Sequence, residues 1–418
     1  MEETKKQYQK RSFLLMKDDF EERLSSQSGG AFAALSDVVL GEGGVVYGCA
    51  LTKDLEVRHI RVTTKEEREA LKGSKYTQSY LGGIFQDVKK DLKEGRLVLF
   101  SGVSCQVAGL KEYIESIGFS SNLLTIDLLC HGCPSQKIFK DFMEYIEKKK
   151  SKKIASINFR NKLKYGWQSH IETVTYEDSS CEDSYIYTKI FHLEAMQKPS
   201  CQNCPFHSQN RPSDITVADA WGAIKENPEM VDNNGLSLVI CNTEKGLKLL
   251  SKISGCTTKE IELKGAYLEG PISRDYLTPS YSNKLWRIYL RHGFEKAFRY
   301  ASRVTFFHAV KNKIRKCIKL PPEDFKPLTK FNAHEGLYSQ TYINAGKANE
   351  SIRLPILYKS KTECMGCGAC YNRCKEIKDA ISMTEDSKGF FYPVVDASKC
   401  IGCHSCEKVC PFKKYDKR

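Results

Sequence analysis

Residues 364–374 read CMGCGACYNRC and residues 400–411 read CIGCHSCEKVCP, so one cysteine spacing occurs twice near the end of the 418-residue chain. In each run three cysteines are separated by two residues, and a fourth follows after three more. Thiolates at this spacing lie on one tight loop, where glycines let the backbone approach a bound group closely. The spacing is typical of [4Fe–4S] sites, so we expect two such clusters here.

Each run is expected to give three ligands to one cluster and its last cysteine to the other, as in bacterial ferredoxins. The first cluster then takes Cys364, Cys367, Cys370 and Cys410. The second takes Cys400, Cys403, Cys406 and Cys374. Zinc is the alternative, but structural zinc sites use separate Cys-x2-Cys pairs and not repeated four-cysteine runs. We therefore predict a small α+β ferredoxin-like domain over residues 353–418, with a covering hairpin that turns at Lys388-Gly389.

Before this domain, short β-rich segments alternate with helical patterns from about residue 28 to residue 252. The expected strands are 45–48, 97–100, 123–129, 215–218 and 236–241. The expected helices are 31–40, 81–93, 107–117, 135–149 and 244–253. Such alternation predicts an α/β fold with a mixed sheet, which we assign to residues 1–280.

The net charge of +14 is concentrated in one segment, because residues 284–319 hold eleven Lys and Arg against one acid. Apolar side chains recur there at helical spacing, so we predict a basic helical region and linker over residues 281–352. The simplest interpretation is an amphipathic helix with a solvated basic face. The alternatives are docking to an acidic electron carrier or peripheral contact with an anionic membrane, and nucleic-acid binding is not expected.

The eighteen cysteines indicate metal or redox chemistry in a reducing compartment. The start of the chain is charged and shows no secretory signal, and no apolar stretch is long enough to span a bilayer. We expect a cytoplasmic protein without a transmembrane segment.

A second group of cysteines falls at the ends of predicted elements. Cys105 and Cys130 each follow a predicted strand, and Cys201 and Cys204 form a Cys-x2-Cys loop. Residues just past the carboxyl ends of strands converge on one crevice, so a third [4Fe–4S] cluster is a hypothesis for these four thiols. Cys133 is a spare candidate ligand. The plainer alternatives are a zinc site on the pair 201/204 and buried free thiols at 105 and 130.

Two polar loops have the composition of phosphate sites. One contains Ser28, Gly29 and Gly30 directly before a predicted helix, whose free N–H groups favour an anion. The other contains Gly73, Ser74, Lys75, Tyr76 and Gln78. Together they suggest a dinucleotide, although neither is a G-x-G-x-x-G fingerprint, and each alone is more often a turn or a solvated loop.

The ordered motifs resemble the family of the coenzyme F420 hydrogenase/dehydrogenase beta subunit over roughly residues 25–300. They include SQSGGAF at 26–32, LKGSKYTQS at 71–79, SGVSCQ at 101–106, DLLCHG at 127–132, NFR at 158–160 and SDITVADAWG at 213–222. The resemblance implies FAD on the loops 28–30 and 73–78, and a cluster on Cys105, Cys130, Cys201 and Cys204 beside it. The chain departs from the family's pattern in that the ferredoxin domain follows this region instead of preceding it.

From these features we expect an iron–sulfur flavoprotein oxidoreductase that passes electrons between a partner carrier, the clusters and FAD, and exchanges hydride with a small acceptor such as coenzyme F420. His131 is a candidate proton relay, with a structural histidine as the plainer alternative. Two other classes remain open: an electron-transfer subunit whose substrate site lies on another chain, and a non-catalytic cluster-bearing sensor module.

Overall fold

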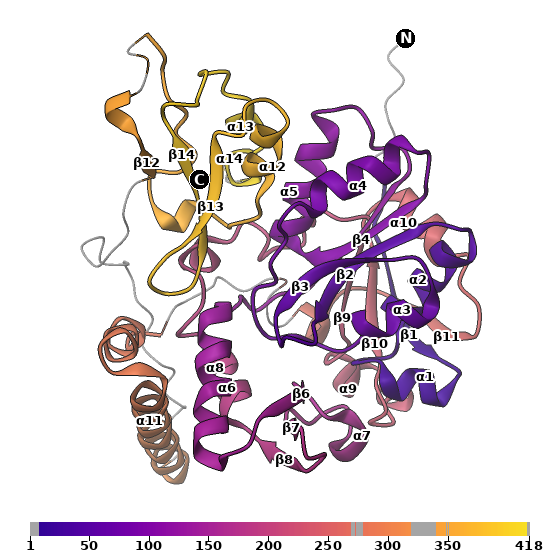
Figure 1. Cartoon of the computed structure of the whole chain (residues 1–418). Helices are drawn as coiled ribbons and strands as arrows, with labels where there is room; N and C mark the ends of the chain where they lie inside the picture. Colours follow the sequence, from indigo (N-terminus) through magenta and orange to yellow (C-terminus); the bar gives the residue numbers. More distant parts are fainter. Residues whose placement is uncertain are drawn as a thin grey trace.

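The computed structural model describes residues 8–268, 272, 279–318, 340–347, 349 and 351–415. An α/β body carries a smaller module formed by the C-terminal residues (Figure 1). The body contains an eight-stranded sheet in the order β11-β1-β10-β9-β5-β4-β2-β3. These strands are β1 (Arg11–Lys17), β2 (Val45–Leu51), β3 (Val57–Val62), β4 (Val98–Val103), β5 (Leu123–Leu128), β9 (Ile215–Asp219), β10 (Ser237–Cys241) and β11 (Cys256–Ile261).

The sheet is mixed, as predicted. Strands β2, β4, β5 and β9 run parallel to their neighbours in the centre. Antiparallel strands extend the sheet on both sides, with β3 beside β2, and with β10, β1 and β11 beyond β9. The carboxyl ends of the parallel strands therefore meet at one edge, where ligand sites of such sheets form.

Helices cover both faces of the sheet because the central strands are apolar on both sides. In β4, Leu99 packs with α2 (Ala31–Gly41) and α10 (Glu244–Leu250). Its neighbours Val98 and Phe100 pack with α4 (Ile84–Lys93) and α5 (Ser104–Glu115) on the opposite face. This alternation along one buried strand fixes its register, since a shift of one residue would exchange the two faces.

All the predicted strands and helices of the body are present, with ends displaced by no more than three residues. The sequence did not predict the outer strands β1, β3 and β11, nor the short helices α1 (Phe20–Ser25), α3 (Lys65–Arg68), α7 (Lys162–Tyr165) and α9 (Ala223–Glu226). Strand β11 shows why, because its side chains are mostly exposed and polar and give no hydrophobic pattern.

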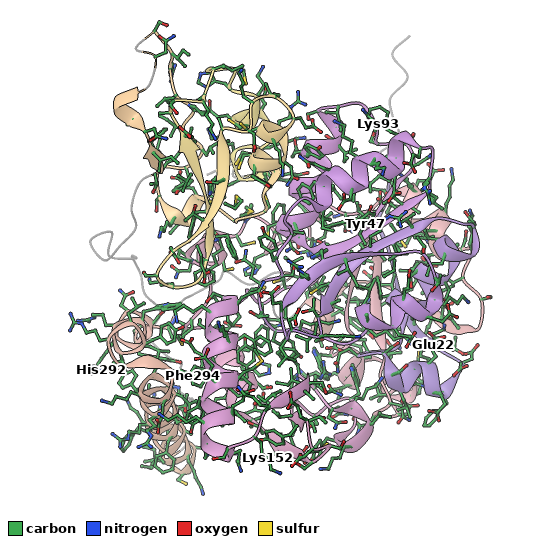
Figure 2. All side chains as sticks on the ribbon, viewed as in Figure 1. Glu22, Tyr47, Lys93, Lys152, His292 and Phe294 are labelled. Carbon is green, nitrogen blue, oxygen red and sulfur yellow. The ribbon has the colours of Figure 1, made fainter. Side chains whose placement is uncertain are left out.

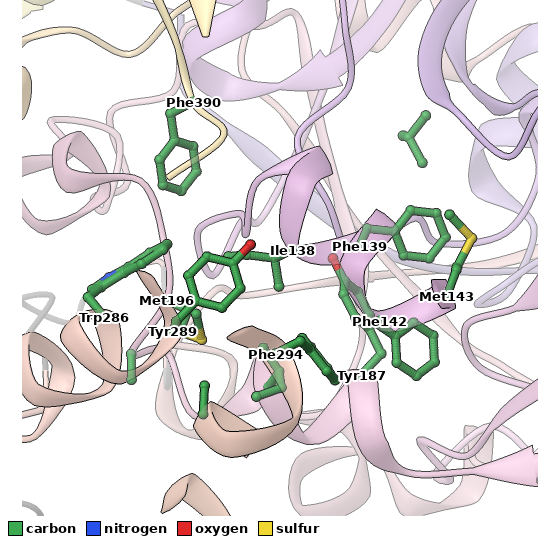
Figure 3. Packing of buried hydrophobic residues seen from close by; sticks show 14 of the residues in the cluster. Ile138, Phe139, Phe142, Met143, Tyr187, Met196, Trp286, Tyr289, Phe294 and Phe390 are labelled. Carbon is green, nitrogen blue, oxygen red and sulfur yellow. The ribbon is translucent and has the colours of Figure 1, made fainter. Parts of the chain in front are cut away.

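A second, three-stranded sheet contains β6 (Ile154–Asn158), β7 (Glu172–Tyr176) and β8 (Cys181–Ser184). It shares a core with α6 (Gln136–Lys150), α8 (Ile186–His192) and the long helix α11 (Ser282–Cys317). Figure 3 shows this core, with Trp286 and Tyr289 of α11 facing Ile138 of α6 and Phe390 of the C-terminal module. The predicted basic region is thus helical, with a break at Gly293 where the backbone leaves helical geometry, and its first half is part of the core.

The C-terminal module has the predicted α+β form. Strands β13 (Ile381–Glu385) and β14 (Phe391–Asp396) make the expected hairpin, and β12 (Thr341–Ile343) adds in parallel to β14. Short helices α12 (Ala369–Lys375), α13 (Ser405–Lys408) and α14 (Pro411–Tyr415) complete it. The predicted linker prolines Pro321, Pro322 and Pro327 lie outside the described residues, and the three domain limits stay predictions. None of the described helices combines the length and apolar character that a membrane crossing needs.

The C-terminal module packs directly on α4 and α5. Gly109 of α5 lies against Cys367, since a Cβ added to Gly109 would come within 2.8 Å of the Cys367 Sγ. Polar contacts surround this point: Glu376 accepts hydrogen bonds from Lys89 and Tyr113, and the Asn372 amide donates to the Gly82 carbonyl at 3.3 Å. The glycine therefore lets the cysteine loop approach the helix backbone.

A Gly109→Ala variant tests this close approach. The added methyl group overpacks the contact with Cys367, so we expect the free energy of unfolding to fall by about 1–3 kcal/mol. Thermal and urea unfolding measure it. Gly41→Ala is the matched control, because a Cβ at Gly41 meets nothing within 4 Å, and its stability should be unchanged or slightly higher. Equal stability of the two variants would show that the module does not pack on α5 in this way.

Candidate functional site

The cysteines of the first predicted set lie close together, with Cys367 buried and Cys364, Cys370 and Cys410 partly buried. Burial, together with the nearby Cys410 and Cys364 thiols, raises the pKa of Cys367 to about 12. Burial and then the other three thiols of the set raise the pKa of Cys370 well above its usual range. Metal ligation supplies the positive charge that buried thiolates need, so this donor set fits an iron–sulfur cluster.

The second predicted set lines one cavity. Cys374, Cys400, Cys403 and Cys406 all border one small pocket, together with Ile381 and other apolar residues. Burial, followed by the nearby Cys374 thiol, raises the pKa of Cys406 to about 12. Thiols and apolar groups line this pocket, and four thiols are the donor set of a [4Fe–4S] cluster. In the part of the chain that the structure describes, no group of three or more His, Cys, Asp or Glu side chains is arranged to hold a single metal ion.

The third set also comes together. Cys105 begins α5 directly after β4, Cys130 follows β5, and Cys201 and Cys204 lie on the short turn Pro199–Asn203 and at its end. Burial, then Cys204, Cys130 and Cys201, raise the pKa of Cys105 well above its usual range. The carboxyl-edge position of the first two thiols follows from the parallel register of β4 and β5.

Cys133 joins this third group. Its thiol hydrogen-bonds to Cys130, and this bond is the main reason why the pKa of Cys130 falls to about 7. The Gly132 N–H also donates to the Cys130 Sγ at 3.3 Å. Five thiols therefore meet here, one more than a cluster needs.

The third set lies beside the first. Cys105, Cys204 and Cys410 all pack around one apolar group, which consists of Ala108, Phe206, Met365 and Phe412. Cys367 is among the thiols that raise the pKa of Cys105. Cys406 of the second set in turn raises the pKa of Cys370. The three sets thus form a row, with the first set in the middle.

Lys198 places a buried cation between the third set and the first. Its Nζ donates to the Phe391 carbonyl at 3.0 Å and lies 3.8 Å from the centroid of the Tyr392 ring. Burial lowers the pKa of Lys198, while thiols from both sets oppose this, namely Cys364, Cys201 and Cys105. Sequence reasoning missed this residue, because a single lysine in a loop carries no signal of burial.

The two predicted phosphate loops meet at their ends. The Ser74 N–H donates to the Gln27 side chain at 3.4 Å, and the Ser28 hydroxyl donates to the Leu236 carbonyl at 2.7 Å. Gly29 packs against the sheet so closely that an added Cβ would be 2.1 Å from the Leu15 oxygen. Gly30, at φ +89°, begins α2 without a side-chain cap, so N–H groups at this helix end lack a side-chain partner.

Two lysines support these loops without pointing a free charge into them. The Lys162 ammonium donates to the carbonyls of Ser28, Asn234 and Arg23, and burial lowers the pKa of Lys162 to about 7. Lys75, which we expected to face a phosphate, donates to three carbonyls of its own loop at residues 70–72. Burial lowers its pKa to about 8.

Tyr76 and Gln78 point in different directions from the second loop. The Tyr76 ring stacks on Phe191 at 4.3 Å and lies near His192. A further group of rings continues from His192 through His170 to Trp221. Gln78 reaches the C-terminal module, where its amide donates to the Met365 carbonyl at 3.4 Å.

His131 lies next to the third cysteine set. Its Nδ1 is 3.5 Å from a Glu194 carboxylate oxygen, its ring meets Phe191 edge-on, and its side chain is 45% exposed. The exposed ring leaves room for proton exchange, so the structure is compatible with the predicted relay and with a structural role.

Comparisons with known proteins find similarity in two separate stretches of the chain. Residues 95–265 match the family model for the C terminus of the coenzyme F420 hydrogenase/dehydrogenase beta subunit, and residues 363–414 match a 4Fe-4S dicluster domain. No curated protein matches. Among solved structures, a chain of the F420-reducing [NiFe] hydrogenase complex from Methanosarcina barkeri is similar at 17% identity, with a TM-score of 0.43 over 72% of this chain and 92% of that chain.

The dicluster match supports two [4Fe–4S] clusters on the C-terminal cysteine runs. The longer match concerns a family of oxidoreductase subunits. Taken together, these matches show that residues 95–265 are similar to the C terminus of the coenzyme F420 hydrogenase/dehydrogenase beta subunit and that residues 363–414 form a 4Fe-4S dicluster domain.

Proposed function

We propose that the chain is an iron–sulfur flavoprotein oxidoreductase that passes electrons between [4Fe–4S] clusters and FAD. The observation that carries the proposal is the contact between the third cysteine set and the first, through their shared apolar group. A cluster on the third set needs a neighbouring site from which it receives electrons. The first set of the dicluster module is such a neighbour, so the third cluster would extend the series of electron sites into the α/β body.

In this proposal the third cluster takes Cys105, Cys130, Cys201 and Cys204, with Cys133 as the spare thiol. The fold holds these residues on three separate elements, so their spacing depends on the sheet and not on one loop. The apolar group around Ala108 and Met365 is buried between the first and third sets. Dry surroundings protect reduced clusters and help set their potentials.

When bound, FAD would accept single electrons from the clusters and transfer two electrons together as a hydride, which the clusters alone cannot do. The uncapped N-terminus of α2 and the closely packed Gly29 and Gly30 support a phosphate site there. The buried Lys162 donates to the Ser28 carbonyl, which helps to fix the loop. The rings around Tyr76, which belongs to the second loop, offer apolar surface for a flavin ring and a small acceptor.

His131, Glu194 and the ring group then surround the place where an acceptor would exchange hydride. We assign His131 the role of proton relay, because its ring is half-exposed and lies beside a carboxylate. The acceptor is a small molecule of the coenzyme F420 type or another hydride acceptor.

A second candidate function is supported by the family description, which names a subunit. In that case the chain carries electrons for a partner chain that holds the substrate site. Purification that yields a stable complex, with activity only when the partner is present, distinguishes this function from the first.

Iron, acid-labile sulfide and flavin, quantified together on protein purified without oxygen, test the main proposal. We expect about twelve irons and one FAD per chain, from three clusters of four irons. About eight irons per chain would contradict the third cluster, and flavin at background level would contradict the assignment as a flavoprotein.

A Cys201→Ser variant should lose about four irons and keep the spectroscopic signals of the dicluster module. The reason is that Cys201 belongs to the third set alone. Cys181→Ser is the matched control, because Cys181 is an exposed thiol on β8. Iron loss in both variants, or in neither, would contradict the assigned ligand set.

A Ser28→Asp variant should weaken FAD binding at least tenfold, since about 1.4 kcal/mol of repulsion between a carboxylate and the phosphates already gives that factor. Ser28→Ala removes the same hydrogen bond to Leu236 without adding charge. Flavin titration of both variants, with iron content as the folding control, separates the charge effect. Equal binding by the two variants would place the phosphates elsewhere.

A Lys198→Met variant should lower the midpoint potentials of the first and third clusters by on the order of 100 mV. The reason is that a buried positive unit charge beside a cluster stabilises its reduced, more negative state, and about 1.4 kcal/mol corresponds to about 59 mV for a one-electron couple. Redox titration followed by electron paramagnetic resonance measures this. Lys248→Met, at an exposed site of α10, removes the same charge far from the clusters and should change nothing. Unchanged potentials in the Lys198 variant would refute its placement between the sets.

A further inference from the structure

Helix α11 is interrupted at Gly293, whose backbone is not helical, and it changes character along its length. Its first half is anchored in the core by Leu285, Trp286, Tyr289, Phe294 and Ala297. The Tyr289 hydroxyl donates to an Asp141 carboxylate oxygen of α6 at 2.7 Å, and Phe294 meets Phe142 and Tyr145 of the same helix. After Ala301, none of the described side chains of α11 is buried. The second half of α11 therefore extends over the surface beside α6 and α8 (Figure 1).

This second half carries a row of exposed apolar side chains, which we call the exposed stripe. Its members and their exposed fractions are Phe306 64%, Phe307 68%, Val310 39%, Ile314 56% and Ile318 60%. At about 100° per residue these positions fall within about 120° of the helix circumference. The stripe is thus one continuous face, and two adjacent exposed phenylalanines on a protein surface indicate a binding site.

Cations border the exposed stripe on both sides. Lys313 lies at one edge and Lys311 at the other, with Arg315 and Lys316 further round the helix and Arg303 at its start. Residues 296–318 contain no Asp or Glu. Many side chains project outward from this helix (Figure 2). An apolar face bordered by lysine and arginine is the pattern of a helix that lies in the interface of a membrane.

We propose that residues 303–318 dock this protein on an anionic lipid surface. The apolar side chains enter the boundary between headgroups and acyl chains, while the lysines and arginines meet the anionic headgroups. Because the first half of α11 is fixed in the core, docking orients the whole body at the surface. Binding is reversible, since the helix lies along the interface and does not cross it.

The charge pattern favours lipid over a second copy of the chain. Pairing two such helices would bring two sets of cations together without any acid from the same segments. An anionic bilayer offers both an apolar layer and negative charge. Each lysine or arginine close to such a surface increases the membrane-binding constant about fivefold. The geometry therefore points to an anionic membrane surface.

Vesicle sedimentation of the full-length protein tests the proposal, and does so independently of the redox function because no cofactor is involved. We expect binding to phosphatidylcholine vesicles that contain about 30% phosphatidylserine, and little binding to phosphatidylcholine alone. Binding should weaken as salt rises, because screening shortens the reach of the charges.

Two variants separate the apolar and electrostatic contributions. Phe306→Ser with Phe307→Ser should weaken binding at least tenfold, and Lys313→Glu with Lys316→Glu should reduce it to the level of neutral vesicles. The matched controls are Leu163→Ser, an exposed leucine on α7, and Lys248→Glu on α10. Both controls should bind like the unchanged protein, and iron content should be normal in all variants.

Equal binding to neutral and anionic vesicles, or binding that neither double variant alters, would overturn the proposal. It would also fail if the protein ignored vesicles and instead formed a dimer that the Phe306/Phe307 variant dissociates. In that outcome the stripe would be an interface between copies of the chain.

Discussion

Cys367 packs on the backbone of α5, and this contact is possible because position 109 carries no side chain. The contact fixes the distance between the dicluster module and the α/β body. It also brings Cys105 and Cys410 to the same apolar group. The buried Lys198 compensates part of the negative charge that thiolates from both sides would concentrate there. The proposed row of electron sites across the two modules depends on this junction.

The centre of the sheet could be predicted because its strands are apolar on both faces and alternate with helices along the sequence. The outer strands of the sheet could not be predicted. Strand β11 is polar and exposed, and β1 is a short apolar run that gains its role only by pairing between β10 and β11. Pairing of this kind is a long-range property, since residues 11–17 and 256–261 meet only in the folded chain. Local pattern therefore identifies a central strand more readily than an added edge strand.

The cysteines of the site could be predicted from the sequence because their spacing, or their position after a strand, indicates metal ligands. The roles of the lysines could not be predicted in this way. Lys75 lies in a loop with the composition of a phosphate site, yet its ammonium donates to carbonyls of its own loop. Lys162 and Lys198 hold the loops and the junction from buried positions, which no sequence pattern revealed. The basic segment was visible as charge alone, and only the structure shows that its apolar face remains exposed beyond Ala301.

The central claim is that the thiol sets of the body and of the C-terminal module hold clusters as direct neighbours. Electron paramagnetic resonance of the fully reduced protein tests this most directly, because neighbouring paramagnetic clusters broaden and split each other's signals. The account predicts a spectrum with spin–spin interaction that simplifies to that of the dicluster module when the third set is disrupted. A spectrum equal to the sum of isolated clusters, with no change on disruption, would contradict it.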